Sequence, residues 1–522
     1  MTPLETTVEP NDWIDRLDGR QMLGLLLGIS LAIKISIWML SPVITSDGPV
    51  YISQAEEFLR GNWNKGLALN NNLFFYPLLI AGLGSAGMDL VTAGQSLSLV
   101  FSVTTVIPLF LLTRRLFNPR VAWWAALAFA VSPAFNEYAV YVMRDPGFLF
   151  MFGWAGYYAL RALSEENFKS FLLFLLFAFF SFLFRIEGFF LPVFVFLFII
   201  GQVALRRTGS SIFLKKLLIF FVVTSLGAGL LSQVFSDGFR RFNRLGTIVS
   251  MLKTPLAKGI FSYDPQVEIQ LRKMEDVLPR GNVDNDFAEI ARENVRTIYF
   301  IGLLENLKRV LYPGFFVACV LGLASFRKYR NTHALFLCQI LGYIFVLYLY
   351  LLHRSFIETR YVYAPVFLLL PWVGYGIDRG MYFLQNVSRL PRFLPWVLVA
   401  TLFSIPAVEA ATEVKRQFVS AKQAGEWLAE RPAINVGPII STHRETPFYA
   451  GRGMQYISTS TKDPDQLASL AKRSNAQLIT LLRRHGEEPA DLQIEHFTLE
   501  QKFTDKRYDT FIFRKQDETS GN

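Results

Sequence analysis

Four short segments of this chain carry the charged residues that acid–base and phosphate chemistry requires. They are SDGPVY at 46–51, MRDP at 143–146, FRIEG at 184–188 and HRSFIETRY at 353–361. Each segment borders a long apolar stretch, where ionisable side chains are costly and are retained mainly for function. The candidate residues are one isolated carboxylate, four arginines and the polar residues beside them: Asp47, Arg144, Asp145, Arg185, Glu187, His353, Arg354, Glu358, Arg360 and Tyr361.

This inventory fits the displacement of a lipid-phosphate leaving group by a hydroxyl. A carboxylate such as Asp47 takes the proton of the attacking hydroxyl. Arginines suit a phosphate because the guanidinium binds it bidentately and keeps its charge at any pH. A single base suffices for one inverting displacement, whereas glycoside hydrolysis usually employs two carboxylates.

Simpler roles remain open for the same residues. Asp is favoured as a helix N-cap, and from spacing alone this role is the better interpretation of Asp47. Arg144 and Asp145 together fit an interfacial cap and anchor, and arginines at a membrane surface often extend their charged ends toward water. In FRIEG the hairpin is so tight that Arg185 and Glu187 must pair with each other or with a ligand.

The elements that position these residues are predicted to be membrane-spanning helices. Of the 522 residues, 52% are hydrophobic and 18% are charged, and the apolar residues form blocks long enough to cross a bilayer. We predict a polytopic α-helical membrane protein with about 11 spans. They lie near 21–45, 89–112, 121–142, 146–163, 169–184, 187–205, 212–235, 309–326, 333–352, 361–378 and 393–410, and the apolar segment 73–88 is too short to count.

Short-loop lysines and arginines set the predicted orientation. Fifteen fall on the side of the N-terminus and four on the opposite side, which places the N-terminus in the cytoplasm. The predicted domains are a cytoplasmic segment 1–20, a transmembrane catalytic domain 21–410 with outer loops 46–88 and 236–308, and an extracytoplasmic domain 411–522. The tail alternates helix and strand patterns, with helices near 414–430 and 463–474 and strands near 434–441, 477–482, 492–499 and 508–514, so we predict a small α/β domain.

Other functions have weaker support in the sequence. The net charge of +10 suggests nucleic acid, but the basic residues lie in short clusters between apolar blocks, so no nucleic-acid partner is expected. A phosphate-cradling glycine loop, HExxH and CxxC are absent. We predict no obligatory metal and no other cofactor, and we leave open the use of a divalent metal. The five histidines have no metal-ligand spacing, and we predict that His443, His485 and His496 lie on the surface of the tail domain.

The order of these motifs resembles the GT-C superfamily of membrane glycosyltransferases. The nearest branch is the dolichyl/polyprenyl-phosphate-mannose mannosyltransferase-like group, with bacterial enzymes that modify lipid A, lipopolysaccharide or protein. The resemblance covers about residues 20–410, and more loosely the tail, where YAGR at 449–452 matches a recurrent element. The matching positions are Asp47, Tyr51, Ala55, Gly61, Tyr76, Pro77, Leu78, Arg144, Asp145, Arg185, Glu187, Gly188, Arg360, Tyr361 and Pro365.

The resemblance implies that Asp47 is the general base, and it reverses the preference for a simple cap. The phosphate-binding residues would be Arg144, Arg185, Arg354 and Arg360. Residues lining the substrate pocket would be Tyr51, Tyr76, Asp145, Glu187, His353 and Tyr361. Two positions depart from the family pattern: Gly48 follows Asp47 where many relatives have a second acid, and Phe75-Tyr76-Pro77 replaces a His-Pro-Pro element.

The expected function is sugar transfer from a polyprenyl-phosphate donor to a hydroxyl on a lipid-linked glycan, surface polysaccharide or protein. The expected location is the outer face of the cytoplasmic (inner) membrane, with the bilayer itself as a partner. Two alternatives from other classes remain. A non-catalytic transporter should show repeat symmetry and broken helices near the midplane, and no repeat is evident. The second alternative is a non-catalytic assembly subunit whose pocket is inactive.

Overall fold

The computed structural model describes residues 13–41, 43–70, 74–165, 167–204, 259–277, 283–325, 331–386, 391, 393–412, 418–485 and 493–516. The chain forms two compact units. The first comprises residues 1–34, 99–139 and 144–411, and the second comprises 35–98, 140–143 and 412–522. The predicted span at 212–235 lies outside the described residues. The predicted domain limits stay predictions.

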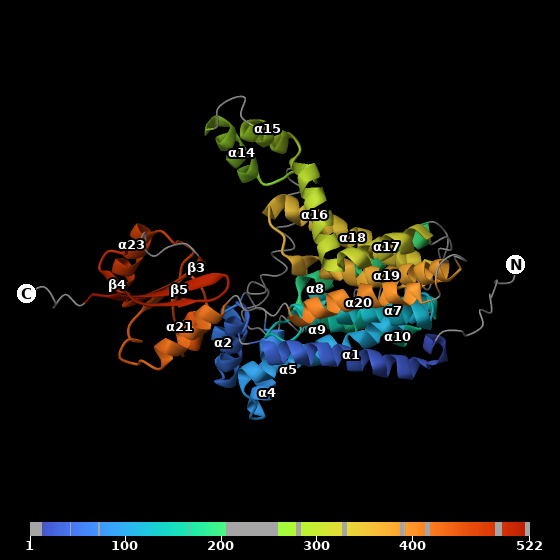
Figure 1. The fold of residues 1–522 in the computed structure, drawn as a ribbon, viewed down its shortest axis with the longest axis horizontal. Helices are drawn as coiled ribbons and strands as arrows, with labels where there is room; N and C mark the ends of the chain where they lie inside the picture. Colours follow the sequence, from blue (N-terminus) through green and yellow to red (C-terminus); the bar gives the residue numbers. More distant parts are fainter. Residues whose placement is uncertain are drawn as a thin grey trace, which may run out of the picture. The chain divides into compact units, whose positions relative to one another are not determined.

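The first unit is helical. Its elements are η1 (Trp13–Arg16), the first part of α1 (Gly19–Leu40), the end of α5 (Leu90–Thr104), α6 (Val106–Leu116), α7 (Pro119–Val131), α8 (Pro133–Asn136), α9 (Asp145–Ser164), α10 (Phe168–Phe184), η2 (Ile186–Phe189), α11 (Phe190–Ala204), α14 (Pro265–Val277), α15 (Val283–Glu293), α16 (Val295–Leu311), α17 (Pro313–Ser325), α18 (Asn331–Arg354), η4 (Thr359–Val362), α19 (Tyr363–Gln385) and α20 (Leu394–Thr412). Within it α7, α9, α10 and α19 run side by side, and α17 packs on α19 (Figure 1).

The helices have the length and composition of membrane spans, which supports a multi-pass membrane protein. Among the described residues five stretches are long and apolar enough to cross a bilayer: 19–40, 90–116, 186–204, 332–354 and 394–412. A sixth is counted if α16 and the helix after it form one span, although they bend by 105° at Tyr312. The predicted count of eleven therefore stays a prediction.

The predicted span at 121–142 is interrupted. Helix α7 ends at Val131, and Ser132 is extended, with φ −63° and ψ 125°. Pro133 explains the break because a residue before proline is pushed out of the helical region. Pro133 then opens the short helix α8, a position where its missing N–H costs nothing. The chain from Glu137 to Arg144 thus forms turns that lead into α9.

The second unit contains the first predicted outer loop and the tail. The loop forms α2 (Gly48–Leu59), α3 (Trp63–Ala68) and α4 (Phe75–Ser85), and α4 packs on α2. The tail forms α21 (Val419–Ala429), β1 (Ile439–Ser441), α22 (Glu445–Tyr449), β2 (Ile457–Ser458), α23 (Pro464–Ser474), β3 (Leu478–Arg484), β4 (Phe497–Thr504) and β5 (Tyr508–Lys515).

The tail is an α/β fold, as its alternating pattern predicts. Its five strands form one sheet of order β2-β1-β3-β5-β4, parallel among β2, β1 and β3 and antiparallel at β5 and β4. Helix α23 packs Leu467 and Ala471 against one face, and α21 packs Ala424 and Leu428 against the other (Figure 1). The pattern placed β4 at 492–499, whereas the strand runs over 497–504, and it did not predict β2 or α22.

Candidate active site

The FRIEG segment forms a tight turn between α10 and η2, and this turn buries an arginine. Helix α10 ends at Phe184, and Arg185 adopts an extended backbone with φ −145° and ψ 144°. The N–H of Gly188 then donates to the carbonyl of Arg185 at 3.0 Å. A Cβ at Gly188 would lie 2.8 Å from Ser181 Oγ and closer still to the α10 backbone, so only glycine fits. This close return holds Arg185 at 3% exposure.

Arg185 is the centre of a buried ionic cluster. Its guanidinium donates to Asp145 at the start of α9 and to Glu187 of its own turn. Arg360 Nη1 lies 4.0 Å from Asp145 Oδ2, and the Arg360 side chain also pairs with Glu358. The structure thus brings together charged residues from three of the four segments singled out in the sequence. Paired charges of this kind meet the requirement that buried ions be compensated.

Aromatic rings enclose this cluster. The Arg185 guanidinium lies 5.5 Å from the ring centroid of Tyr361 and 5.8 Å from that of Phe148. Tyr343 donates its hydroxyl to the carbonyl oxygen of Glu187 at 2.9 Å. These contacts restrict Arg185 to one position, and a planar guanidinium between aromatic faces is the arrangement expected for a desolvated arginine.

Arg144 differs from Arg185 in its hydrogen bonding. Its Nε and Nη1 atoms are buried, yet neither has a hydrogen-bond partner among the residues that the structure describes. Arg144 also acts electrostatically on both Asp145 and Glu187, so it lies beside the same cluster. Buried donors without a partner are costly, so a water molecule, an ion or a ligand is expected to complete their bonding.

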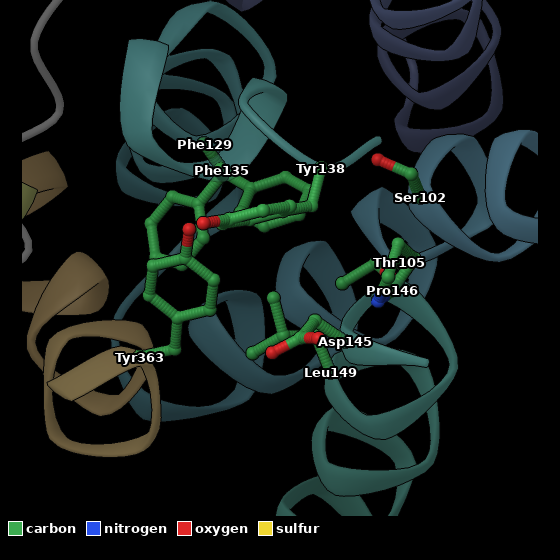
Figure 2. A pocket seen from close by; sticks show the side chains of 9 residues that line it. All are labelled: Ser102, Thr105, Phe129, Phe135, Tyr138, Asp145, Pro146, Leu149 and Tyr363. Atoms are coloured by element: carbon green, nitrogen blue, oxygen red, sulfur yellow. The ribbon is translucent and has the colours of Figure 1, made fainter. Parts of the chain in front are cut away.

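A pocket opens next to Asp145. It is lined by Ser102, Thr105, Phe129, Phe135, Tyr138, Asp145, Pro146, Leu149 and Tyr363. Figure 2 shows the four aromatic rings gathered on one side and Ser102, Thr105 and Pro146 on the other, with Asp145 and Leu149 of α9 between them. Its free volume is about 10 Å³, which is room for about one water molecule, so the pocket as it stands is too small for a sugar or a lipid phosphate.

A buried lysine lies near this pocket and was missed in the sequence analysis. Lys34 of α1 is 1% exposed, and its Nζ donates to Ser30 Oγ at 2.9 Å. The same atom lies 5.8 Å from the centroid of Phe129, one of the pocket residues. A lysine inside an otherwise apolar span is itself the signal that could have identified it, since charges at this depth are rare.

Asp47 belongs to the second unit and does not act as an ordinary cap. It occupies the N-cap position of α2, but its side chain makes no capping hydrogen bond. Its Oδ1 lies instead 3.6 Å from Nη1 of Arg444, which immediately precedes α22 in the tail. The Asp47 side chain is 27% exposed, so the carboxylate is both held and accessible.

Tyr51 and Tyr76, the two predicted pocket tyrosines of the first loop, pack against each other. Their ring centroids are 5.5 Å apart in an edge-to-face arrangement. The Tyr76 hydroxyl donates to the carbonyl of Gly94 at 2.7 Å and lies 2.8 Å from Ser98 Oγ. Both rings are buried, at 1% and 2% exposure, so they support the loop from within.

The remaining predicted residues have mixed outcomes. Arg354 is exposed in the last turn of α18, and among the described residues it forms none of the ion pairs of the Arg185 cluster. His353 beside it is half-buried. His443 was predicted at the surface, and this is wrong: it is 9% exposed, and its Nε2 lies 2.6 Å from Oγ1 of Thr446 in α22.

The described residues offer no cluster that fits a metal ion. No group of three or more His, Cys, Asp or Glu side chains lies close enough together within that part of the chain. The carboxylates of the ionic cluster are already paired with arginines.

Comparisons with known proteins concern the family and the fold of the chain. Residues 74–227 match the model of the dolichyl-phosphate-mannose-protein mannosyltransferase family. Three solved structures from Archaeoglobus fulgidus share the fold. The oligosaccharyltransferase tethered to an acceptor peptide with an NVT sequon aligns with TM-score 0.57 and 12% identity, over 88% of this chain and 68% of that chain. Its complex with Zn and sulfate aligns with TM-score 0.55 and 12% identity, over 87% and 67%.

The third structure is the archaeal oligosaccharyltransferase AglB with an inhibitory peptide and a dolichol-phosphate. It aligns with TM-score 0.50 and 12% identity, over 90% of this chain and 70% of that chain. No curated protein sequence matches the chain. The fold is therefore that of a multi-pass membrane protein of the oligosaccharyltransferase type. Together with the family match, this confirms the resemblance to the GT-C superfamily of membrane glycosyltransferases.

Proposed function

We propose that this chain is an inverting glycosyltransferase that moves a sugar from a polyprenyl-phosphate donor to a hydroxyl acceptor. The reaction takes place at the outer face of the cytoplasmic membrane, with the tail domain on the same side. The excess of lysine and arginine in the opposite short loops supports this orientation. The family match and the dolichol-phosphate bound by the archaeal neighbour support a polyprenyl-phosphate donor.

The observation that carries this proposal is the state of Arg144. Arg185 is committed to two carboxylates, whereas the buried Nε and Nη1 of Arg144 have no hydrogen-bond partner among the described residues. These two donors lie on different edges of the guanidinium, so each can donate one charge-assisted hydrogen bond to an anionic oxygen. Arg144 is therefore the first ligand of the donor phosphate, with Arg360 beside it and Arg185 as their buried support.

The chemistry is a single displacement at the anomeric carbon. The acceptor oxygen forms a bond to that carbon while the bond from carbon to the phosphate oxygen breaks, and the configuration inverts. Asp47 takes the proton of the acceptor hydroxyl. The leaving polyprenyl phosphate keeps the electron pair of the broken bond, and Arg144 and Arg360 stabilise the negative charge that develops on it.

The test is sugar transfer by the purified full-length protein. Labelled polyprenyl-phosphate sugars are supplied with a membrane extract as acceptor, and product and donor binding are measured for wild type and Asp47→Asn. We expect wild type to transfer and Asp47→Asn to bind donor normally with transfer reduced at least about 100-fold, the usual effect of losing a general base.

Glu56→Gln is the matched control, because Glu56 lies on α2 with a side chain 40% exposed and paired with Arg60. It should keep wild-type transfer. Equal transfer by wild type and Asp47→Asn would overturn the base assignment. Absence of transfer by wild type with every donor would overturn the enzymatic function and favour a transporter or an assembly subunit.

A further inference from the structure

The tail reaches the first loop through a short helix, within the second compact unit. Arg444, the residue before α22, lies 3.6 Å from Asp47 through Nη1 and Oδ1. At the end of the same helix the Tyr449 hydroxyl accepts a hydrogen bond from the backbone N–H of Ile44 at 3.0 Å. Two residues of one helical segment therefore contact the chain on either side of Ser46.

Helix α22 is held rigidly from its other side. A Cβ at Gly425 of α21 would lie 2.5 Å from Tyr449 Cβ and 2.6 Å from the carbonyl oxygen of Thr446, so the two helices are in direct backbone contact. Thr446 Oγ1 also donates to the carbonyl of Ala421 at 2.8 Å. The position of Arg444 is thus set by the tail fold and not by its own flexible side chain alone.

The chain that follows α22 also returns to the first loop. Arg452 donates through Nε to Asn435 Oδ1 at 2.7 Å, which ties the YAGR segment into the tail. One residue further, a Cβ at Gly453 would lie 3.4 Å from Ser53 Oγ on α2. Arg444, Tyr449 and Gly453 of the tail thus lie against α2 and the residues just before it, where Asp47 is found.

We propose that Arg444 is a positioning residue for Asp47, supplied by the tail to the catalytic carboxylate. This inference rests on the proposed function of Asp47 as general base. An ion pair as exposed as this one, 45% at Arg444 and 27% at Asp47, adds at most about 1 kcal/mol to stability. The ion pair acts instead on the orientation of Asp47. The Asp47 carboxylate makes no capping hydrogen bond to α2, so the Arg444 guanidinium is the group that orients it.

The same geometry assigns a role to the tail, because the tail completes the surroundings of Asp47. A base must lie within hydrogen-bond reach of the proton that it takes, and small misplacements cost large factors in rate. Arg444 touches neither donor nor acceptor in this proposal. Its loss should therefore lower kcat and leave the KM for the donor unchanged.

The test measures kcat and donor KM for Arg444→Gln, Arg444→Lys and the double variant with Asp47→Asn, in the assay described above. We expect Arg444→Gln to lower kcat about tenfold with donor KM unchanged within a factor of about two. Arg444→Lys should fall between wild type and Arg444→Gln, because lysine restores the charge but not the planar fork. On the Asp47→Asn background Arg444→Gln should cause no further loss, since the two residues act as a unit.

Arg431→Gln is the matched control, an arginine of the same tail that stacks 4.4 Å from the centroid of Trp427, and it should keep wild-type kcat. Additive losses in the double variant, or wild-type kcat in Arg444→Gln, would overturn the proposal. If Arg444→Gln fails to fold, Arg444→Lys decides alone, because wild-type kcat in that variant overturns the proposal and a reduced kcat with unchanged donor KM supports it. Inactivity of Asp47→Asn together with wild-type kcat in Arg444→Gln leaves the proposed function standing and overturns the role of Arg444. Full activity of Asp47→Asn overturns both the base assignment and the role of Arg444, and leaves the glycosyltransferase function standing.

Discussion

Glu445 is a buried carboxyl group of the second unit, and its titration allows a quantitative prediction. The residue is 1% exposed, and its Oε1 is buried without a hydrogen-bond partner among the described residues. Burial raises the pKa of Glu445 from 4.5 to about 7. The Asp47 carboxylate adds to this rise, whereas two backbone N–H groups and the Arg444 charge oppose it. The folded state is therefore more stable when Glu445 is protonated than when it is ionised.

The direction of the pH effect follows from the raised pKa. An acid whose pKa is higher in the folded state stabilises that state fully below the unfolded pKa, and the contribution disappears as the pH rises through the folded pKa. For Glu445 this window runs from pH 4.5 to about 7. At about 1.4 kcal/mol for each pH unit, the loss reaches about 3 kcal/mol, or at least about a hundredfold in the equilibrium for local opening. Glu445→Gln keeps the size of the side chain but does not ionise. At pH 8 the backbone amides around Glu445→Gln should therefore exchange more slowly than those of wild type by this factor.

Amide hydrogen exchange of the full-length protein, read by mass spectrometry on the peptide 441–450, measures this local opening. His443 complicates the wild-type profile, because burial lowers the pKa of His443 from 6.5 to about 3 and its contribution to stability is lost as the pH falls below 6.5. Comparing Glu445→Gln with wild type at one pH cancels the effect of His443. Glu430→Gln, at a side chain 75% exposed, is the control. Equal protection of Glu445→Gln and wild type at pH 8 would refute the reasoning.

Three further predictions concern the first unit. Arg185→Gln should lower the free energy of unfolding by about 3–5 kcal/mol, because the carboxylates of Asp145 and Glu187 lose their cation. The loss should appear as a lower melting temperature, whereas Arg354→Gln, at an exposed position, should leave the melting temperature unchanged. Arg144→Gln should weaken binding of a polyprenyl phosphate about tenfold in a direct binding assay while the melting temperature holds, since a charge-assisted contact is lost. An unchanged affinity would contradict its assignment. Gly188→Ala should reduce the yield of folded protein, because its Cβ would overlap the α10 backbone, and a normal yield would show that the turn is wider than described.

Much of the first unit could be predicted from the sequence because its signals are local. A block of apolar residues defines a helix whatever its neighbours, and FRIEG places Arg185 and Glu187 so close that their pairing follows from the turn. The tail pattern predicted β3 and α23 for the same reason. The end of α7 was missed because the apolar run continues past Pro133, and hydropathy alone does not register a missing N–H.

The contacts of Asp47 could not be predicted, because they join distant parts of the chain. Arg444 and Glu445 lie in a tail segment whose hydropathy resembles any polar loop, and no periodicity relates them to the first loop. The burial of His443 depends equally on how α22 packs on α21. Lys34 was detectable as one charge in an apolar span, but its place against Phe129 required the packed helices.

The balance of charge in the ionic cluster bears on the role proposed for Arg144. Arg185 at 3% exposure is neutralised by Asp145 at 1% and Glu187 at 14%, so this pair of carboxylates exceeds it by one charge. Arg360, at 15%, restores neutrality toward Asp145 but also pairs with the more exposed Glu358. With Arg144 the cluster holds three guanidinium groups, Arg144, Arg185 and Arg360, and their charges balance those of the three carboxylates Asp145, Glu187 and Glu358. A sugar phosphodiester carries one negative charge, whereas the phosphate monoester that leaves carries up to about two. In the proposed reaction the guanidinium of Arg144, whose Nε and Nη1 have no hydrogen-bond partner among the described residues, is the group expected to meet this increase in negative charge.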